Sequence, residues 1–149
     1  AGLHPPFPAA RVDGIVADGE VVRLGPLALT VHATTGHSPG STSWSWTSCD
    51  GNDCRNIIYA DSLTAVSADE YRFSDHPELV TAFHRSFSKL SKLPCELLLT
   101  PHPGASGMFE RFTGTAPFYD SQACIKYAMA AEEKLDRRLM TERGQADDK

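Results

Sequence analysis

Alternation of hydrophobic and polar residues dominates the first half of the chain and predicts β-strands there. In residues 27–34, LALTVHAT, every second side chain is apolar, so an extended strand would have one apolar and one polar face. A Gly-Pro turn at 25–26 separates this segment from the preceding EVVRL, a spacing typical of two strands joined by a tight turn. Further strand-like runs, each bounded by turn-forming residues, lie at 20–24, 41–48 and 56–61.

The same period of two assigns three conspicuous side chains to strand faces. His32 falls on the polar face of its strand, where a surface position without a chemical role is expected. Trp44 and Trp46 share one face, and neighbouring aromatic side chains on one face are more often core than a ligand platform. None of the three is therefore taken as a candidate for chemistry.

In residues 74–93, SDHPELVTAFHRSFSKLSKL, apolar residues recur every three to four positions instead of every second one, which predicts a helix. Asp75, with Glu78 three residues later and Pro77 in the first turn, has the pattern of a helix start. His84 lies beside the apolar stripe as a partly buried packing residue, and His76 is expected in solvent. The stripe itself consists of Leu79, Phe83, Phe87 and Leu90.

The remainder of the chain predicts one more strand and one more helix. Residues 96–100, ELLLT, form a short continuous apolar run, which fits a strand buried on both faces. A final helix is expected from about Ser121, with a tail that frays after Gly144. The order of strands, helix, strand and helix predicts a layered fold of the α/β or α+β type. The side chains that this final helix should turn inward are Cys124, Tyr127, Ala128, Ala131 and Leu135.

Charge and hydropathy exclude two classes of partner. The formal net charge of −5 argues against nucleic acid, which requires a basic surface. No apolar run approaches the roughly 20 residues of a membrane-spanning helix. The chain also has neither an initiator Met nor a signal-like apolar segment, so we expect it to begin after the natural start, as a mature protein or as a fragment.

Four cysteines, at 49, 54, 95 and 124, bear on the compartment. None forms a C-x-x-C pair or a zinc-finger spacing, which argues against a structural zinc site. An even number fits two disulfides and an oxidising compartment, with reduced thiols in the cytosol as the alternative. Of the three pairings, local spacing favours Cys49 with Cys54 and Cys95 with Cys124. The longer bridge would contribute roughly 3–4 kcal/mol in the chain-entropy estimate.

Candidate chemistry gathers where three predicted strands end. The first ends in a loop with His37, the second at Asp61 and Ser62, and the third in a loop with His102. Binding sites form at such strand ends because the sheet fixes the backbone while the loops present side chains. Both histidines stand among Gly and Pro, which restrict the backbone as metal ligands require. Taken alone, this pattern favours neither a metal site nor a structural role.

At these same positions the sequence resembles a known family. The motifs TGHSPGS, YADSL and LPCELLLTPHPGAS closely resemble the metallo-β-lactamases, specifically the third subclass, in which Ser replaces a zinc-binding Cys of another subclass. The resemblance extends from about Asp13 to Arg143. It implies an α/β fold, one half of an αβ/βα sandwich with a mixed sheet and flanking helices. Residues 1–13 would be a linker or arm between halves, 14–143 the C-terminal half, and 144–149 the frayed tail.

The resemblance also assigns roles to individual residues. His37 would bind the first of two zinc ions and His102 the second. Ser62 and Thr64 match positions that hydrogen-bond the carboxylate of the substrate. Asp61 lies within the same motif, and the only role that the resemblance suggests for it is a contact that supports the metal ligands. Cys95 and Cys124 resemble the disulfide of this subclass, and Cys49 and Cys54 an extra disulfide of some of its members.

One motif of the family, H-x-H-x-D-H, is absent from this chain. In the family it supplies the other protein ligands of both metals, whereas a catalytic zinc normally has three. The expected function is zinc-dependent hydrolysis of β-lactams, including carbapenems, by a periplasmic or secreted enzyme, with this chain inactive until it is joined by an N-terminal half. The alternatives are a lactonase or thioesterase of the same fold, which would change the carboxylate contacts, and a non-catalytic fragment whose PHPGAS loop only packs.

Overall fold

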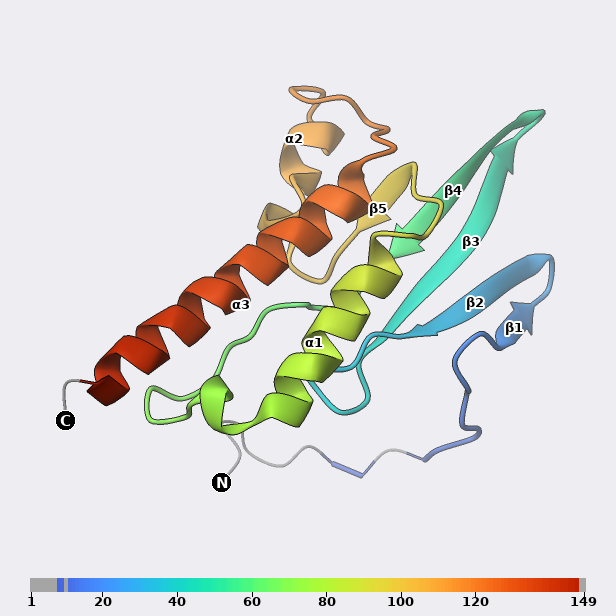
Figure 1. Cartoon of the computed structure of the whole chain (residues 1–149). Helices are drawn as coiled ribbons and strands as arrows, with labels where there is room; N and C mark the ends of the chain where they lie inside the picture. Colours follow the sequence, from blue (N-terminus) through green and yellow to red (C-terminus); the bar gives the residue numbers. More distant parts are fainter. Residues whose placement is uncertain (1–7, 10, 148–149) are drawn as a thin grey trace.

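A five-stranded mixed sheet forms the centre of the molecule in the computed structural model, which describes residues 8–9 and 11–147 (Figure 1). The strands follow one another across the sheet in chain order, and all neighbours are antiparallel except the last pair. The predicted α/β fold with a mixed sheet is confirmed. The strands are β1 (Val21–Leu24), β2 (Leu27–Ala33), β3 (Thr42–Asp50), β4 (Asp53–Tyr59) and β5 (Leu97–Leu99).

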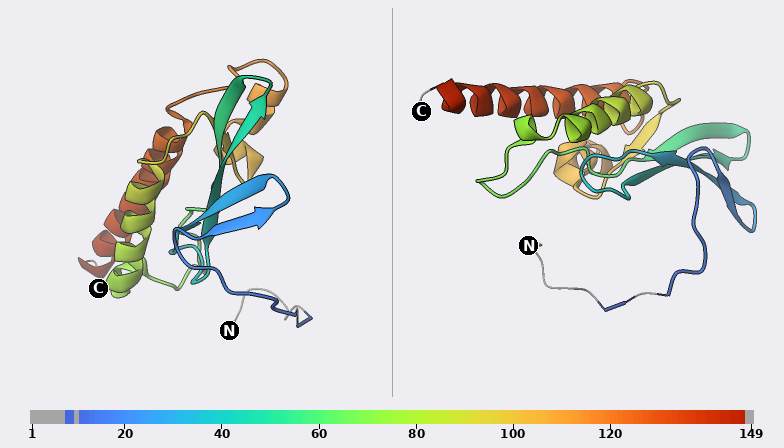
Figure 2. Two further views of the ribbon diagram at one scale, coloured as in Figure 1. Left: turned by 90° about the vertical axis from the view of Figure 1, so that its right-hand side faces the viewer. Right: turned by 60° about the horizontal axis from the view of Figure 1, so that its bottom comes forward.

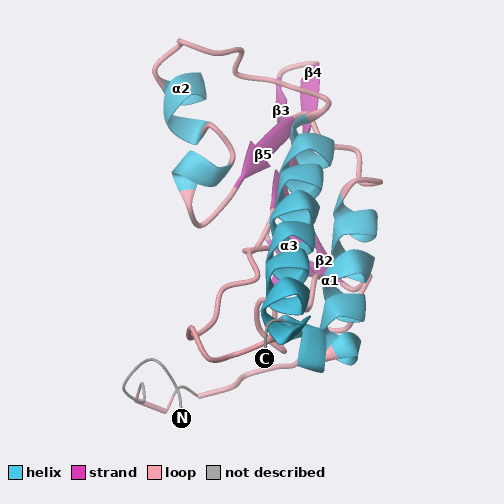
Figure 3. Ribbon diagram, turned by 60° about the vertical axis from the view of Figure 1, so that its left-hand side comes forward, coloured by secondary structure: helices cyan, strands magenta, loops and turns pink. Residues whose placement is uncertain are grey.

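The described helical elements all follow β4 in the chain, before and after β5. The crossover that makes β4 and β5 parallel contains α1, since parallel neighbours cannot be joined by a hairpin. Figure 3 shows α1 and α3 side by side, with α2 set apart near β5. In the described part of the chain, no helix is both long enough and apolar enough to span a bilayer. The helical elements are η1 (Phe73–Asp75), α1 (Pro77–Leu90), η2 (Pro103–Ala105), α2 (Met108–Phe112) and α3 (Ala123–Asp147).

The main core lies between one face of the sheet and the two long helices (Figure 2). Ile58 and Leu98 contribute from the sheet, and the predicted stripe of α1 contributes Phe83, Phe87 and Leu90, all buried. Leu79 packs against this cluster, so the helical period of this segment is confirmed. The predicted inward residues of α3 are also buried: Cys124, Tyr127, Ala128, Ala131 and Leu135.

The opposite face of the sheet is apolar as well. Cross-strand partners share a face, and one row there runs through Val31, Trp44, Tyr59 and Leu99. A second row contains Trp46, Ile57 and Leu97. Both rows alternate with the residues that face the helices. The expectation that Trp44 and Trp46 belong to the core is therefore wrong: both are only half-buried, on the face away from α1 and α3.

His32 illustrates the same reversal of faces. It pairs with Ser43 across the sheet, in the set of positions that face the helices, and its Nε2 lies 2.7 Å from the Ser45 hydroxyl. Burial lowers its pKa, although the nearby Asp18 carboxylate acts in the other direction. The expected surface position is wrong, because the polar face of β2 is the one turned toward α1. His32 remains a hydrogen-bonded packing residue without a place in the candidate site.

The start of α1 differs from its sequence pattern. Its N-cap is His76, with Pro77 as the first helical residue, and no side chain caps the helix. Asp75 instead ends the short helix η1. His76 stacks on Tyr71 with ring centroids 4.6 Å apart, so it is not the fully solvated side chain expected. The turn of η1 thus takes the place of the predicted capping box.

The two ends of the chain follow the sequence only in part. Residues 8–9 and 11–17 form no helix or strand and are exposed, as expected for an arm, and the rest of the arm lies outside the described residues. At the other end α3 continues past Gly144 to Asp147, within the tail that the sequence predicts to fray. Glycine costs only about 1 kcal/mol in a helix interior, and the contacts of Glu142 hold this turn in place.

Glu142 is a buried carboxylate that joins α3 to η1. It is 2% exposed and accepts hydrogen bonds from the Ser74 N–H at 2.8 Å and from Arg138 at 2.6 Å. Arg138 also donates to the Tyr71 carbonyl at 2.8 Å. Burial alone raises the pKa of Glu142, but these hydrogen bonds outweigh it and leave the pKa below its usual value.

Glu142→Gln is expected to lower the free energy of unfolding at pH 7 by about 1–3 kcal/mol. Because the folded-state pKa lies below the usual 4.5, the carboxylate contributes stability above that value and loses it as the pH falls through the folded pKa. Urea denaturation between pH 7 and pH 3 measures this, with Glu133→Gln on the exposed face of α3 as the matched control. Equal pH dependence in all three proteins would contradict the role of Glu142.

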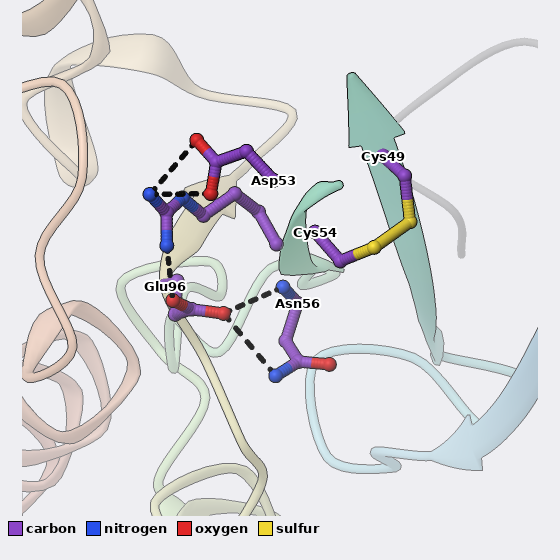
Figure 4. Close-up of polar contacts among 6 residues, drawn as sticks. Cys49, Asp53, Cys54, Asn56 and Glu96 are labelled. Atoms are coloured by element: carbon purple, nitrogen blue, oxygen red, sulfur yellow. Dashed lines mark hydrogen bonds and ion pairs between the residues drawn. A yellow bond between two sulfur atoms is a disulfide. The ribbon is translucent and has the colours of Figure 1, made fainter. Parts of the chain in front are cut away.

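Both predicted disulfides are formed, Cys49–Cys54 across β3 and β4, and Cys95–Cys124 between the segment just before β5 and α3. Beside the first, Glu96 accepts hydrogen bonds from the backbone and side chain of Asn56 at 2.8 and 3.2 Å (Figure 4). The backbone hydrogen bond holds the pKa of Glu96 below its usual value. These contacts join the start of β5 to β4, a connection that the sequence did not predict.

Removal of the shorter disulfide, by Cys49→Ser with Cys54→Ser, is expected to cost at most about 2 kcal/mol, because so short a loop gains little from closure. Urea denaturation under non-reducing conditions measures the loss. The Glu96 contacts should keep β4 and β5 paired, so amide exchange at Asn56 should stay slow. Fast exchange there would show that the disulfide, and not Glu96, holds this edge.

Candidate metal centre

The three predicted site loops leave the same edge of the sheet. β2 and β4 are both antiparallel to β3 and therefore run in the same direction, and β5 is parallel to β4. Their carboxyl ends meet at one edge, where loops from different strands can converge on a common ligand. The segments that follow these ends carry His37, Asp61 with Ser62, and His102.

The loop after β2 is fixed by buried hydroxyl groups and by one glycine. The hydroxyls of Thr34 and Ser43 lie 2.8 Å apart, and the Thr34 N–H donates to the Ser41 carbonyl at 3.0 Å. Gly36 has φ of 144°, and a Cβ there would lie 2.7 Å from the Phe83 ring. Only glycine allows the backbone to pass so close to α1. Phe83 thereby sets the position from which the next residue, His37, projects.

His37 is exposed, and its ring is oriented from one side. Its Nδ1 lies 2.7 Å from the Thr64 carbonyl oxygen. Since a carbonyl can only accept, Nδ1 carries a proton, and in the neutral imidazole Nε2 then has a free lone pair. Metal-binding histidines typically use the remote ring nitrogen in this way, donating the other N–H to a backbone carbonyl. The sequence had no signal for this contact, because its partner lies 27 residues away.

The segment after β4 is a tightly hydrogen-bonded turn. The Asp61 N–H donates to the Ser43 hydroxyl at 3.0 Å, and the Asp61 carboxylate accepts from the Ser62 N–H at 2.8 Å. Ser62 is 3% exposed, and its hydroxyl oxygen accepts from the Thr64 N–H at 3.4 Å. Thr64 is half-buried. Asp61 and Ser62 thus shape the turn that presents the Thr64 carbonyl to His37.

Tyr127 of α3 supports this turn from the core side. Its hydroxyl accepts from the Leu63 N–H and donates to the Asp61 carbonyl, both at 3.4 Å. Burial raises the pKa of Tyr127, so it stays protonated and keeps this donor. The helical pattern predicted an inward position for Tyr127, but its tie to the site required the tertiary structure.

His102 is exposed and stands as the N-cap residue of η2. Its carbonyl accepts hydrogen bonds from the Thr100 hydroxyl at 3.0 Å and from the Ala105 N–H at 2.9 Å. The Thr100 hydroxyl also lies 2.7 Å from that of Ser106. The backbone of the loop is thus closed on itself, and the imidazole projects from a fixed base.

Arg111 of α2 is a site-supporting residue that sequence reasoning missed. It is 7% exposed and donates through Nη2 to the carbonyls of Leu98 and Ser106. It therefore connects β5 to the far end of the His102 loop. A lone arginine in a short helix gives no sequence signal for burial, since arginine is rarely buried without a partner.

The donor set in this chain fits part of a metal site. His37 and His102 present imidazoles from loops at one edge of the sheet. The contact of His37 Nδ1 with the Thr64 carbonyl leaves its Nε2 available as a metal ligand. Within residues 8–9 and 11–147, no three side chains of His, Cys, Asp or Glu lie close enough to hold one ion. Any metal bound here would need further ligands from elsewhere.

No protein-family model matches the chain. Solved structures do: the metallo-β-lactamase MIM-1 from Novosphingobium pentaromativorans is 49% identical, with a TM-score of 0.90 over 94% of this chain and 52% of that one. SMB-1, bound to 2-mercaptoethanesulfonate, is 45% identical, with a TM-score of 0.81 over 85% and 51%. BJP-1 of Bradyrhizobium japonicum, a subclass B3 enzyme, is 32% identical, with a TM-score of 0.79 over 94% and 55%.

The chain thus spans about half the length of each of these enzymes. The identities of 45% and 49% extend over 85% and 94% of the chain, so the likeness goes beyond a shared fold. These matches identify the chain as similar to the subclass B3 metallo-β-lactamases over about half of their length, consistent with the C-terminal half of their fold.

Proposed function

We propose that this chain supplies one half of a zinc-dependent enzyme that hydrolyses the amide bond of β-lactams, carbapenems included. The observation that carries the proposal is the orientation of His37, whose Nδ1 is held by the Thr64 carbonyl while Nε2 is free. His37 and His102 would each bind one metal ion. Two disulfides fit an enzyme of the periplasm or the outside medium.

The second half would pack on the apolar face of the sheet that α1 and α3 leave uncovered. Its rows of aromatic and aliphatic side chains include Tyr59, which is 37% exposed here. A contiguous apolar surface of this kind marks a contact surface. It borders the edge from which His37 and His102 project, so a half bearing H-x-H-x-D-H could complete both metal sites at the same seam.

The residues of this chain would then bind and orient the substrate. Bound zinc would supply Lewis acidity and lower the pKa of a water molecule to about 7. The Thr64 hydroxyl would donate to the substrate carboxylate and so fix its position. Ser62 can add its own O–H, since its oxygen accepts from the Thr64 N–H. Thr64, half-buried where Ser62 is 3% exposed, is the better placed of the two. Asp61 would act through the turn and not on the substrate.

The test is to produce the chain alone and together with the segment encoded upstream of it. Zinc content, hydrolysis of a carbapenem and inhibition by 2-mercaptoethanesulfonate, the thiol found on SMB-1, are measured for both. The proposal expects zinc uptake, turnover and inhibition only when both halves are present. A thiol inhibitor is informative because thiolates are strong zinc ligands.

Each component of the proposal has its own contrary result. An upstream segment without H-x-H-x-D-H would remove the completed metal site. Zinc uptake without β-lactam hydrolysis, but with turnover of a lactone or thioester, would indicate another hydrolase of the same fold. Failure of the two halves to associate would leave the apolar face unexplained and favour a non-catalytic fragment.

A further inference from the structure

A cavity lies between the start of α3, α2 and the end of the His102 loop, lined by residues that support this loop but not by His37 or His102. It has a volume of about 270 Å³ and is lined in part by Ser106, Arg111, Asp120 and Lys126. A water molecule takes about 30 Å³ in the liquid, so the cavity has room for a small polyatomic ion with water. Tyr127 also lines it, and two of these five charged or polar side chains are cationic.

Arg111 is the unusual wall of this cavity. Its side chain is more than nine-tenths buried, its Nη2 donates only to backbone carbonyls, and its Nε has no partner. Among the described residues no carboxylate lies within ion-pair distance of it. A buried cation without a hydrogen-bonded counter-charge is costly, and burial lowers the pKa of Arg111 although the Asp120 carboxylate acts in the other direction. The arrangement is that of a site whose anion comes from outside the chain.

The nearest acidic group cannot fill that role. Asp120 accepts from the Gln122 N–H at 2.9 Å through one oxygen and from the Lys126 ammonium at 2.7 Å through the other. The carboxylate is therefore occupied by the first turn of α3, and these contacts lower its pKa. Lys126 thus donates the hydrogen bond to this carboxylate, and Asp120 acts on Arg111 only through space: it raises the pKa of Arg111 by less than burial lowers it.

We infer that this cavity binds a small inorganic oxyanion, such as phosphate or sulfate, against Arg111. The planar guanidinium matches the spacing of two oxygens on such an ion. The Ser106 hydroxyl and the positive end of α3 face the same space. The inference does not depend on the proposed function. An ion bound here would also touch the segment that carries His102, and would hold that loop against α3.

The test is a titration of the whole chain with sodium phosphate, and separately with sodium sulfate, at constant ionic strength set by sodium chloride. Amide chemical shifts are followed by NMR. We expect saturable shifts centred on Ser106, Arg111 and Ala123 with both oxyanions, and none with chloride alone. Shifts that do not saturate, or that scatter over the exposed lysines and arginines, would overturn the site.

Variants distinguish binding in this cavity from non-specific attraction of anions to positive side chains. Arg111→Lys keeps the charge but removes the planar guanidinium that donates two parallel hydrogen bonds, and should weaken phosphate binding about tenfold. Ala130→Phe, on the exposed rim of the cavity, fills the space while Arg111 stays in place, and should abolish binding even if Arg111→Lys does not fold. Arg137→Lys on the outer face of α3 is the matched control and should bind as the parent does. Unchanged affinity in folded Ala130→Phe would refute the inference.

Discussion

Replacing His37 by Ala is expected to lower kcat/KM for a β-lactam about a thousandfold in protein that carries both halves, because losing several kcal/mol of metal-dependent stabilisation corresponds to that factor. The Nδ1 contact with the Thr64 carbonyl orients Nε2 as a metal ligand, and alanine removes the donor. The zinc content of the first site should fall in parallel. Hydrolysis assays and metal analysis on the same samples measure both.

The matched control is His84→Ala. His84 is also partly exposed, but it lies on α1 and bonds Glu132 of α3 at 3.0 Å, away from the loops at the sheet edge. The His84→Ala protein should retain full zinc content and turnover, whereas the His102→Ala protein should lose the second metal. A folded His37→Ala protein with parental zinc content and turnover would show that His37 only packs its loop.

Gly36→Ala is expected to destabilise the chain by roughly 2–6 kcal/mol and to disorder the His37 loop, from backbone strain and overpacking together. The φ of 144° lies in a region that favours glycine, and the new Cβ would sit 2.7 Å from Cδ1 of Phe83. Phe83 is 1% exposed in the centre of the core, so its ring cannot move aside cheaply. Urea denaturation measures the loss.

Gly40→Ala in the same loop is the control. No atom lies within 4 Å of a Cβ at Gly40, and its φ is not positive, so its unfolding free energy should change little. Phe83→Leu combined with Gly36→Ala should recover part of the packing cost, because the two changes act on one contact. If both single glycine variants are equally stable, the close approach of Phe83 is not what requires glycine.

The sequence predicted the elements well where one period dominated. The alternation of β2 and the stripe of α1 appear in the structure at the predicted positions. The prediction was wrong where the same local pattern is compatible with two structures. The Asp75–Glu78 spacing is that of a capping box, yet the chain forms the turn of η1 there and starts α1 after His76. The final helix, whose tail the sequence predicts to fray after Gly144, runs to Asp147, and Glu142 in its last turns bonds the distant Ser74.

For the candidate site, the positions were predictable but their connections were not. Gly and Pro around His37 and His102 mark fixed loops at strand ends, and the metallo-β-lactamase motifs name the same residues. The contacts that orient them gave no sequence signal: Thr64, 27 residues away, holds the His37 ring, and Arg111 joins the His102 loop to Leu98 of β5. No local pattern encodes these contacts, since each depends on how β4, β5 and α2 come together.

By itself, then, the sequence determined which residues alternate, which loops are rigid and to which family the motifs belong. These follow from local stereochemistry and from residue identity. Only the tertiary structure decided that the apolar side of β2, with Trp44 and Trp46, faces away from the helices, and that His32 faces them. The physical reason is that a strand period defines two faces but not which layer covers each, a choice made by packing over the whole sheet.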